Sequence, residues 1–292
     1  MEKKFELTDN FVINALGIKL FQIKCTKAFK NANEGDLGGY VEKEENLSQS
    51  GDAWVYGNAQ VYGDARVSGD AQVYGNAQVY GDARVYGDAR VSGDAWVYGN
   101  AWVYGDARVS GDAWVYGNAQ VYGNAQVYGD ARVSGDAWVY GNAQVYGDAR
   151  VSGDAWVSGN ARVSGDAWVS GNAQVYGNAQ VYGDARVSGD AQVYGNAQVY
   201  GDARVSGDAW VSGDARVEND HMHCGFDCFG SCNRHTHAYM TNENKVEIRC
   251  GCFRGSIEEF ERKVKETHAG TIYEKQYKAI INLIKIKFGI DG

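Results

Sequence analysis

Residues 51–68 read GDAWVYGNAQVYGDARVS, which is three copies of a six-residue repeat, Gly-(Asp/Asn)-Ala-x-Val-(Tyr/Ser). The repeat continues without a gap to Glu218, which gives 28 copies in which x is Trp, Gln or Arg. A short fixed period predicts stacked repeats over most of the chain and not an ordinary globular core. Collagen is excluded because Gly recurs at every sixth position and the 292 residues include no Pro.

Alternation within the repeat predicts one short strand per copy. Ala and Val are two positions apart and therefore point to the same side of a strand, while x and the residue after Val point to the other side. Gly followed by Asp or Asn supplies a corner that tolerates a positive φ. We expect three repeats to close one triangular coil of 18 residues, with Ala and Val inside and successive coils paired as parallel β-structure.

This inward pair, a branched residue and a small residue two positions before it, resembles the left-handed β-helix of hexapeptide-repeat proteins. With the preceding segment EGDLGGYVEKEENLSQ (residues 34–49), the chain resembles the YdcK-like group of that class over about residues 10–218. The resemblance implies a mainly β fold, a left-handed parallel β-helix of 18-residue triangular coils, and it implies a phage or prophage origin. A small α+β domain is expected to follow the coils.

The sequence predicts three domains. They are an N-terminal cap with an irregular first coil (residues 1–50), the hexapeptide-repeat β-helix (51–218), and a C-terminal β-hairpin with two helices (219–292). Counting back in sixes places Val41 and Leu47 at the Ala position of the first coil and Leu37 at the Val position. Short strands within residues 5–29 are expected to cover the open edge of this coil.

The charge balance narrows the partners and the location. The chain has 28 basic and 37 acidic residues, and its net charge of −9 comes from the repeats, which hold 18 Asp and one Glu against ten Arg. Proteins that neutralise phosphates are normally basic, so direct nucleic-acid binding is not expected, although an acidic nucleic-acid mimic is an alternative. No apolar run reaches the roughly 18 residues of a membrane span. The charged start MEKKFELTDN lacks an apolar signal region, and we therefore expect a cytoplasmic protein of a bacterial host.

Every third repeat should lie on the same side of the coils, which predicts a binding face rich in aromatic and arginine side chains. Its residues are Trp96, Trp114, Arg132, Arg150, Trp168, Arg186, Arg204, Tyr98 and Tyr116. Exposed aromatic ladders favour a partner-binding surface. The alternative is a solvated surface in which each Arg neutralises the Asp two residues before it, as Arg132 would neutralise Asp130. Calcium along the Asp rows is not expected, because the signature GGxGxDxUx is missing.

Catalysis is not expected either. The resemblance to hexapeptide acyltransferases implies a His general base and loops inserted between coils, but no His precedes His221 and the repeats contain no insertion. A general base needs a sheltered site that adjusts its pKa, and uniform coils offer none. An acyltransferase-like enzyme is the alternative.

The composition changes after Asp220. Ser256-Ile-Glu-Glu259 is a capping box that predicts a helix to about His268, and a second helix is expected from about Ile272 to Phe288, ended by Gly289. Residues 234–240 and 245–253 predict a hairpin before these helices. The stretch CGCFRGSIEEFERKVKETH (residues 250–268) resembles a small domain that follows such repeats in phage-type proteins.

A structural zinc site is predicted on this hairpin. If Tyr239 pairs with Val246, then His235, His237, Cys250 and Cys252 share one face and supply two imidazoles and two thiolates. A one-residue slip would separate the pairs. Competing donors lie nearby, and they are His221, His223, Cys224, Cys228 and Cys232. Buried thiols with surface His residues, or a redox function, are alternatives, and disulfides are not expected in a reducing compartment.

Together these features predict a non-catalytic binding or scaffold protein of phage or prophage origin. Its expected partner is a host protein, for example a defence factor that it inhibits. The C-terminal domain is expected to bind that partner or to form a homo-oligomer.

Overall fold

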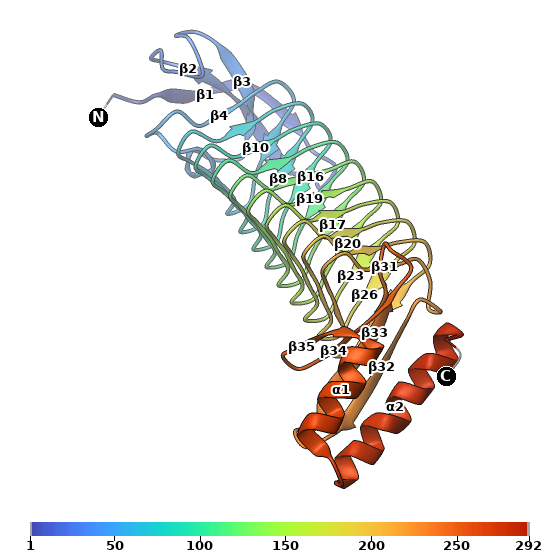
Figure 1. Cartoon of the computed structure of the whole chain (residues 1–292). Coiled ribbons are helices and arrows are strands. Elements are labelled where there is room, and N and C mark those ends of the chain that lie inside the picture. The colour runs from blue at the N-terminus through green and yellow to red at the C-terminus, as the bar shows by residue number, and fades with distance from the viewer. Residues whose placement is uncertain (1, 291–292) are drawn as a thin grey trace. The chain divides into compact units, whose positions relative to one another are not determined.

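The computed structural model describes residues 2–290 and divides the chain into two compact units, residues 1–160 and 161–292 (Figure 1). Unit 1 holds the N-terminal strands and stacked coils of repeats. Unit 2 holds further coils, a four-stranded antiparallel sheet and two helices. No helix within residues 2–290 is long and apolar enough to cross a lipid bilayer. The mainly β fold with a parallel solenoid is thus confirmed.

The coils of unit 1 have three sides, each formed by very short parallel strands. Side A consists of β5 (Gln60–Val61), β8 (Gln78–Val79), β11 (Trp96–Val97), β14 (Trp114–Val115), β17 (Arg132–Val133) and β20 (Arg150–Val151). Side B consists of β6 (Arg66–Val67), β9 (Arg84–Val85), β12 (Trp102–Val103), β15 (Gln120–Val121), β18 (Trp138–Val139) and β21 (Trp156–Val157). Side C consists of β4 (Trp54–Val55), β7 (Gln72–Val73), β10 (Arg90–Val91), β13 (Arg108–Val109), β16 (Gln126–Tyr128) and β19 (Gln144–Tyr146).

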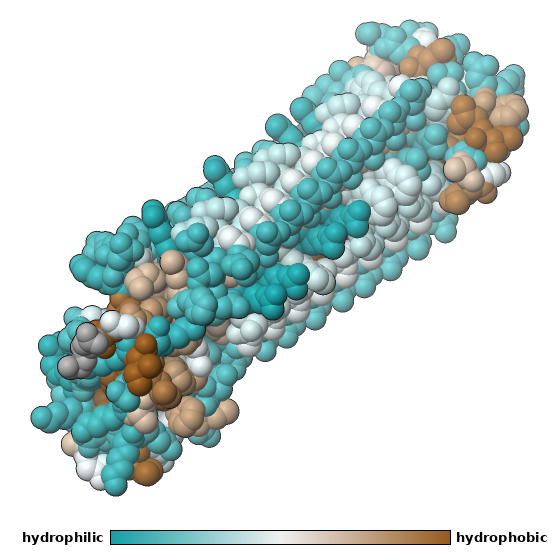
Figure 2. All heavy atoms as spheres, turned by 90° about the vertical axis from the view of Figure 1, so that its right-hand side faces the viewer, coloured by the Kyte–Doolittle hydropathy of each residue, from teal (hydrophilic) through white to brown (hydrophobic). Residues whose placement is uncertain are grey.

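Successive coils pair in strict register, with each residue opposite its equivalent one coil later. Trp96 pairs with Trp114, so one coil is 18 residues long as predicted. The Trp96 amide donates to the Ala113 carbonyl at 2.9 Å, and the Tyr98 amide donates to the Val115 carbonyl at 3.0 Å. The repeat Ala and Val side chains are buried, while x faces outward. Figure 2 shows the result on the surface of the coils, where residues of similar hydropathy form straight rows.

Glycine is required at the corners by two separate constraints. Gly117 has a φ of +71°, which L side chains rarely adopt, and a Cβ there would lie 3.0 Å from the Gly135 amide nitrogen of the next coil. We expect Gly117→Ala to lower the free energy of unfolding by roughly 2 kcal/mol, of which about 1–2 kcal/mol is the cost of the left-handed conformation. Gly17→Ala is the control, because Gly17 has a φ of +79° but no atom within 4 Å of the added Cβ. A smaller loss for Gly117→Ala than for Gly17→Ala in denaturant unfolding would contradict this account.

Three N-terminal strands cover the first coil, as predicted. β1 (Phe5–Ile13) pairs antiparallel with β2 (Lys19–Cys25), which pairs antiparallel with β3 (Leu37–Val41). β3 then joins side A in parallel. The only cation within 9% exposure in this region, Lys4, is buried beneath these strands and donates from Nζ to the Ala53 carbonyl at 2.9 Å among the described residues. Burial lowers the pKa of Lys4 to about 8.

The predicted phase of the first coil was wrong by two residues. Val41 pairs with Val61, and Leu47 bridges Val67, so both occupy the Val position and not the Ala position. Leu37 is 55% exposed instead of facing inward. The two additional residues are accommodated at the 3₁₀ turn η1 (Glu44–Asn46), where the Asn46 side-chain amide donates to the Gly63 and Ala65 carbonyls at 3.0 and 2.9 Å. This side chain replaces ladder hydrogen bonds that a regular coil would make.

Unit 2 continues the same three-sided pattern. Side A has β23 (Trp168–Val169), β26 (Arg186–Val187) and β29 (Arg204–Val205). Side B has β24 (Gln174–Val175), β27 (Gln192–Val193) and β30 (Trp210–Val211). Side C has β22 (Arg162–Val163), β25 (Gln180–Val181), β28 (Gln198–Val199) and β31 (Arg216–Val217).

The last part of unit 2 is an antiparallel sheet packed against two helices. The sheet order is β32 (His223–Phe229), β33 (Arg234–Met240), β34 (Val246–Cys250) and β35 (Phe253–Ser256). The helices are α1 (Ile257–His268) and α2 (Ile272–Phe288), and both match their predicted bounds. The predicted capping box of α1 is present, and Gly289 ends α2 with a φ of 63°. The strands β32 and β35 were not predicted.

Candidate functional site

Side A of unit 1 stacks aromatic and arginine side chains as the sequence predicts. The rings of Trp96 and Trp114 are stacked, with centroids 5.1 Å apart and planes 4° from parallel. The Arg132 guanidinium lies over the Trp114 ring at 5.0 Å. Arg150 follows one coil later, because β17 pairs with β20. The coil spacing therefore brings flat side chains to within stacking distance of one another.

A second ladder of tyrosines runs beside this one. Tyr62, Tyr80, Tyr98 and Tyr116 stack in sequence with centroids 4.8–5.0 Å apart and nearly parallel planes. Tyr98 also meets Trp114 edge-on at 6.5 Å. Burial raises the pKa of Tyr80 to about 12, so its phenol stays neutral at physiological pH. Tyrosine ladders also form on side B, through Tyr86, Tyr104, Tyr122 and Tyr140, which was not predicted although the same count by threes would have found them.

The predicted neutralisation of each Asp by the Arg two residues later was wrong. Within the described residues, no direct ion pair joins Asp130 to Arg132 or any other such pair of the repeats. The arginines pack on tryptophan rings one coil away, because the planar guanidinium matches the ring at that spacing. Several corner carboxylates accept from an amide one coil earlier, as when Asn76 Nδ2 donates to Asp94 Oδ1 at 2.9 Å.

These rows enclose a shallow groove of about 450 Å³ on side A of unit 1. Its lining combines the aromatic and arginine ladder with the acidic corner, through Asn76, Gln78, Asp94, Trp96, Asp112, Trp114, Asp130 and Arg132. In unit 2, the Arg186 guanidinium lies over the Trp168 ring at 6.0 Å, and Trp168 is 40% exposed. The Arg204 amide donates to Asp220 Oδ1 at 2.8 Å. The predicted binding face is thus an ordered aromatic surface within each unit.

The predicted zinc ligands are not brought together, because the hairpin register differs by one residue. Tyr239 pairs with Glu247, and Met240 pairs with Val246. Cys250 therefore lies opposite Thr236 on the face that packs against the helices, and Cys252 lies in the exposed turn before β35. The apolar residues Val246 and Ile248 must join the helix-side core, and this requirement sets the register.

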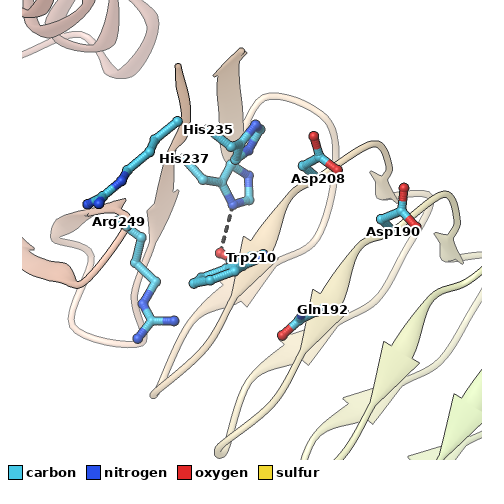
Figure 3. Close-up of a pocket in the computed structure, with 9 residues that line it drawn as sticks. Asp190, Gln192, Asp208, Trp210, His235, His237 and Arg249 are labelled. Carbon is cyan, nitrogen blue, oxygen red and sulfur yellow. Dashed lines mark hydrogen bonds between the residues drawn. The ribbon is translucent and has the colours of Figure 1, made fainter. Parts of the chain in front are cut away.

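His235 and His237 lie on the opposite face of the sheet, toward the last coil of unit 2 (Figure 3). His237 is 1% exposed, and its Nδ1 lies 2.8 Å from the Trp210 carbonyl oxygen. His223, from the unpredicted strand β32, joins them, and its Nδ1 lies 3.1 Å from His237 Nε2. His235 Nδ1 hydrogen-bonds the Asp227 carboxylate. The histidine cluster, defined as His223, His235 and His237, thus replaces the predicted mixed set.

The environment of the cluster keeps its buried rings neutral. Burial lowers the pKa of His237 to about 3, and the neighbouring His223 and His235 lower it further. Burial also lowers the pKa of His223. Since a carbonyl only accepts hydrogen bonds, His237 carries its proton on Nδ1, and Nε2 keeps a free lone pair. Two neutral imidazoles with fixed tautomers result.

A groove of about 440 Å³ opens beside the cluster in unit 2. It is lined by His235, His237, Trp210, Arg249, Asp190, Gln192, Asp208, Arg234 and Gly251. The Arg249 guanidinium lies 5.1 Å from the Tyr194 ring and 5.7 Å from the Trp210 ring. Within the described residues its Nε and one terminal nitrogen have no hydrogen-bond partner. Burial lowers the pKa of Arg249, and the charge of Arg254 lowers it further.

The thiols take no part in this cluster. All six cysteines are free; Cys25 and Cys250 are buried, Cys224 is half-buried, and Cys228, Cys232 and Cys252 are exposed. Burial raises the pKa of Cys224 to about 11, which makes it a poor thiolate donor. Across residues 2–290, no three His, Cys, Asp or Glu side chains already converge on a single metal position.

The stacked coils define a solenoid protein of the hexapeptide-repeat class. The family model of the YdcK β-solenoid repeat matches residues 59–75, 77–93, 83–99, 89–105, 101–117, 125–141, 143–159, 155–171, 179–195 and 197–213. The repeat region of the chain therefore belongs to the YdcK β-solenoid repeat family. A comparison with curated proteins finds no match.

Proposed function

We propose that the chain is a non-catalytic binding protein and that side A of unit 1 contacts a protein partner. The observation that carries this proposal is the ordered stack of Trp96, Trp114 and Arg132 beside the 450 Å³ groove. Trp, Tyr and Arg supply most of the binding energy in protein interfaces. Because the coil already orders these side chains, little conformational entropy is lost when a partner binds them.

The charge of the groove favours a partner with basic side chains. Asp94, Asp112 and Asp130 line one edge, at the spacing of the coils. Such a row attracts Lys and Arg side chains and favours association with a complementary surface. The partner we propose is a cytoplasmic protein of a bacterial host, such as a defence factor inhibited by binding, as the resemblance to phage-type proteins implies. Self-association through the C-terminal domain stays a prediction, to be checked by the mass of the chain in sedimentation.

Paired tryptophan variants test the proposal. We expect Trp96→Ala/Trp114→Ala to abolish capture of a stoichiometric protein from a host lysate, because each lost aromatic anchor costs about 2 kcal/mol or more of binding energy. Trp138→Ala/Trp156→Ala is the matched control, since these rings stack at 5.4 Å on side B of the same unit. Equal capture by both double variants and the unmodified chain would refute a role for side A.

A further inference from the structure

Three imidazole rings lie close together on the coil-facing side of β32 and β33. Gly225 pairs with His237, which leaves His223 and His235 diagonally on either side of the His237 ring. Ring centroids are 5.3 Å apart for His223 and His237 and 5.6 Å apart for His235 and His237. A Cβ on Gly225 would lie 2.6 Å from His235 Cε1, so the glycine leaves space for that ring. The sheet therefore gathers three rings in the space usually taken by four side chains.

Each ring directs one nitrogen at an oxygen outside the cluster. His237 Nδ1 donates to the Trp210 carbonyl at 2.8 Å, and His235 Nδ1 hydrogen-bonds the Asp227 carboxylate. His223 Nε2 lies 4.0 Å from Asp220 Oδ1. Histidines that bind a metal show this division, because one nitrogen coordinates the ion while the other is held by a carboxylate or a carbonyl.

The other nitrogens are the ones available for an ion. His223 Nδ1 and His237 Nε2 are 3.1 Å apart, and His235 Nε2 is buried without a hydrogen-bond partner in the described part of the chain. Two nitrogens that each lie about 2.0–2.1 Å from one tetrahedral zinc ion are roughly 3.3 Å apart. The His223–His237 pair is thus spaced for one ion, which would replace the proton that they share. Rotation of the His235 ring about its side-chain bonds supplies the third nitrogen.

We infer that His223, His235 and His237 bind one divalent transition-metal ion, with zinc as the probe of choice. Three neutral imidazoles suit zinc, copper or nickel, and three protein ligands leave one coordination position open. That position faces the 440 Å³ groove, where Figure 3 shows Asp208 on the side of the groove near His235 and His237. Asp220 and Asp227 add negative charge behind two of the ligands. The site does not depend on partner binding by side A.

Zinc titration of the full chain after chelator treatment tests this inference. We expect one zinc ion per chain by calorimetry, and a cobalt-substituted spectrum without a thiolate-to-cobalt charge-transfer band. His235→Ala should weaken zinc binding at least tenfold. Asp227→Asn should weaken it about 10–100-fold, as loss of an outer hydrogen-bond partner does. Asp227 is 59% exposed, so this variant probes the site without changing the core, and it decides the matter if His235→Ala does not fold.

Two controls separate the histidine cluster from its neighbours. His221→Ala removes an exposed imidazole two positions from His223, and Cys252→Ser removes an exposed thiol of the mixed set predicted from the sequence. Both variants should bind zinc as the unmodified chain does. The inference is overturned if the unmodified chain binds no zinc, if Asp227→Asn binds as tightly as the unmodified chain, or if Cys252→Ser loses the ion together with a thiolate band.

Discussion

Val121→Asp should lower the free energy of unfolding by roughly 3 kcal/mol or more, because it places an unpaired carboxyl group in an apolar interior. Val121 is fully buried in β15 and is paired with Val103 and Val139 of the adjacent coils. Burial should raise the pKa of the new carboxyl group above its unfolded value. The penalty should therefore be small below about pH 4, where the group is protonated in both states, and should grow as the pH rises. Melting temperatures at several pH values measure both effects.

Asp130→Asn is the control for the buried charge. Asp130 lies at an exposed corner, and such surface substitutions change stability by about 0.5 kcal/mol or less. A melting temperature for Val121→Asp equal to that of Asp130→Asn would show that the repeat Val side chains do not form the interior.

Trp54→Ala should destabilise the N-terminal end of unit 1 by about 3–5 kcal/mol, the usual loss for a buried Trp replaced by Ala. Trp54 occupies the outward position x, but it is 1% exposed because the N-terminal segment covers it. Its ring meets Phe29 edge-on at 5.5 Å and Phe5 at 6.4 Å. Hydrogen exchange should show faster opening of β1 and β2, since solenoids lose structure locally.

Trp156→Ala is the matched control for the cap, because Trp156 occupies the same repeat position but is 40% exposed. Its loss should leave exchange in β1 and β2 unchanged. If both variants left the protection of β1 and β2 intact, the cap would not depend on Trp54.

The coils were predictable because their pattern is repeated many times. A shift of one residue would turn every Val outward in 28 repeats at once, so register and side assignment follow from the period alone. Trp96, Trp114 and Arg132 therefore stack as predicted. The same period says nothing of what covers a coil, and so the burial of Trp54 was not predicted.

The non-repeated segments were less predictable because each pairing occurs once. The two-residue shift at Val41 depends on Asn46 replacing ladder hydrogen bonds, which no periodicity reveals. The hairpin slipped by one residue because Val246 and Ile248 pack against helices that alternation within the hairpin does not take into account. A second signal was present in the sequence. His223-x-Gly225 places a ring and a gap on alternate positions of a strand, which would have grouped His223 with His235 and His237.

The central claim, that side A of unit 1 binds a protein partner, is tested most directly by site-specific photo-crosslinking. A photoreactive residue in place of Gln78 would lie in the groove with Trp96 and Trp114, whereas one in place of Gln126 would lie on side C of the same unit. We expect one host protein to be crosslinked from position 78 and not from position 126. Crosslinking of that protein from position 126 alone, or equally from both positions, would contradict the claim.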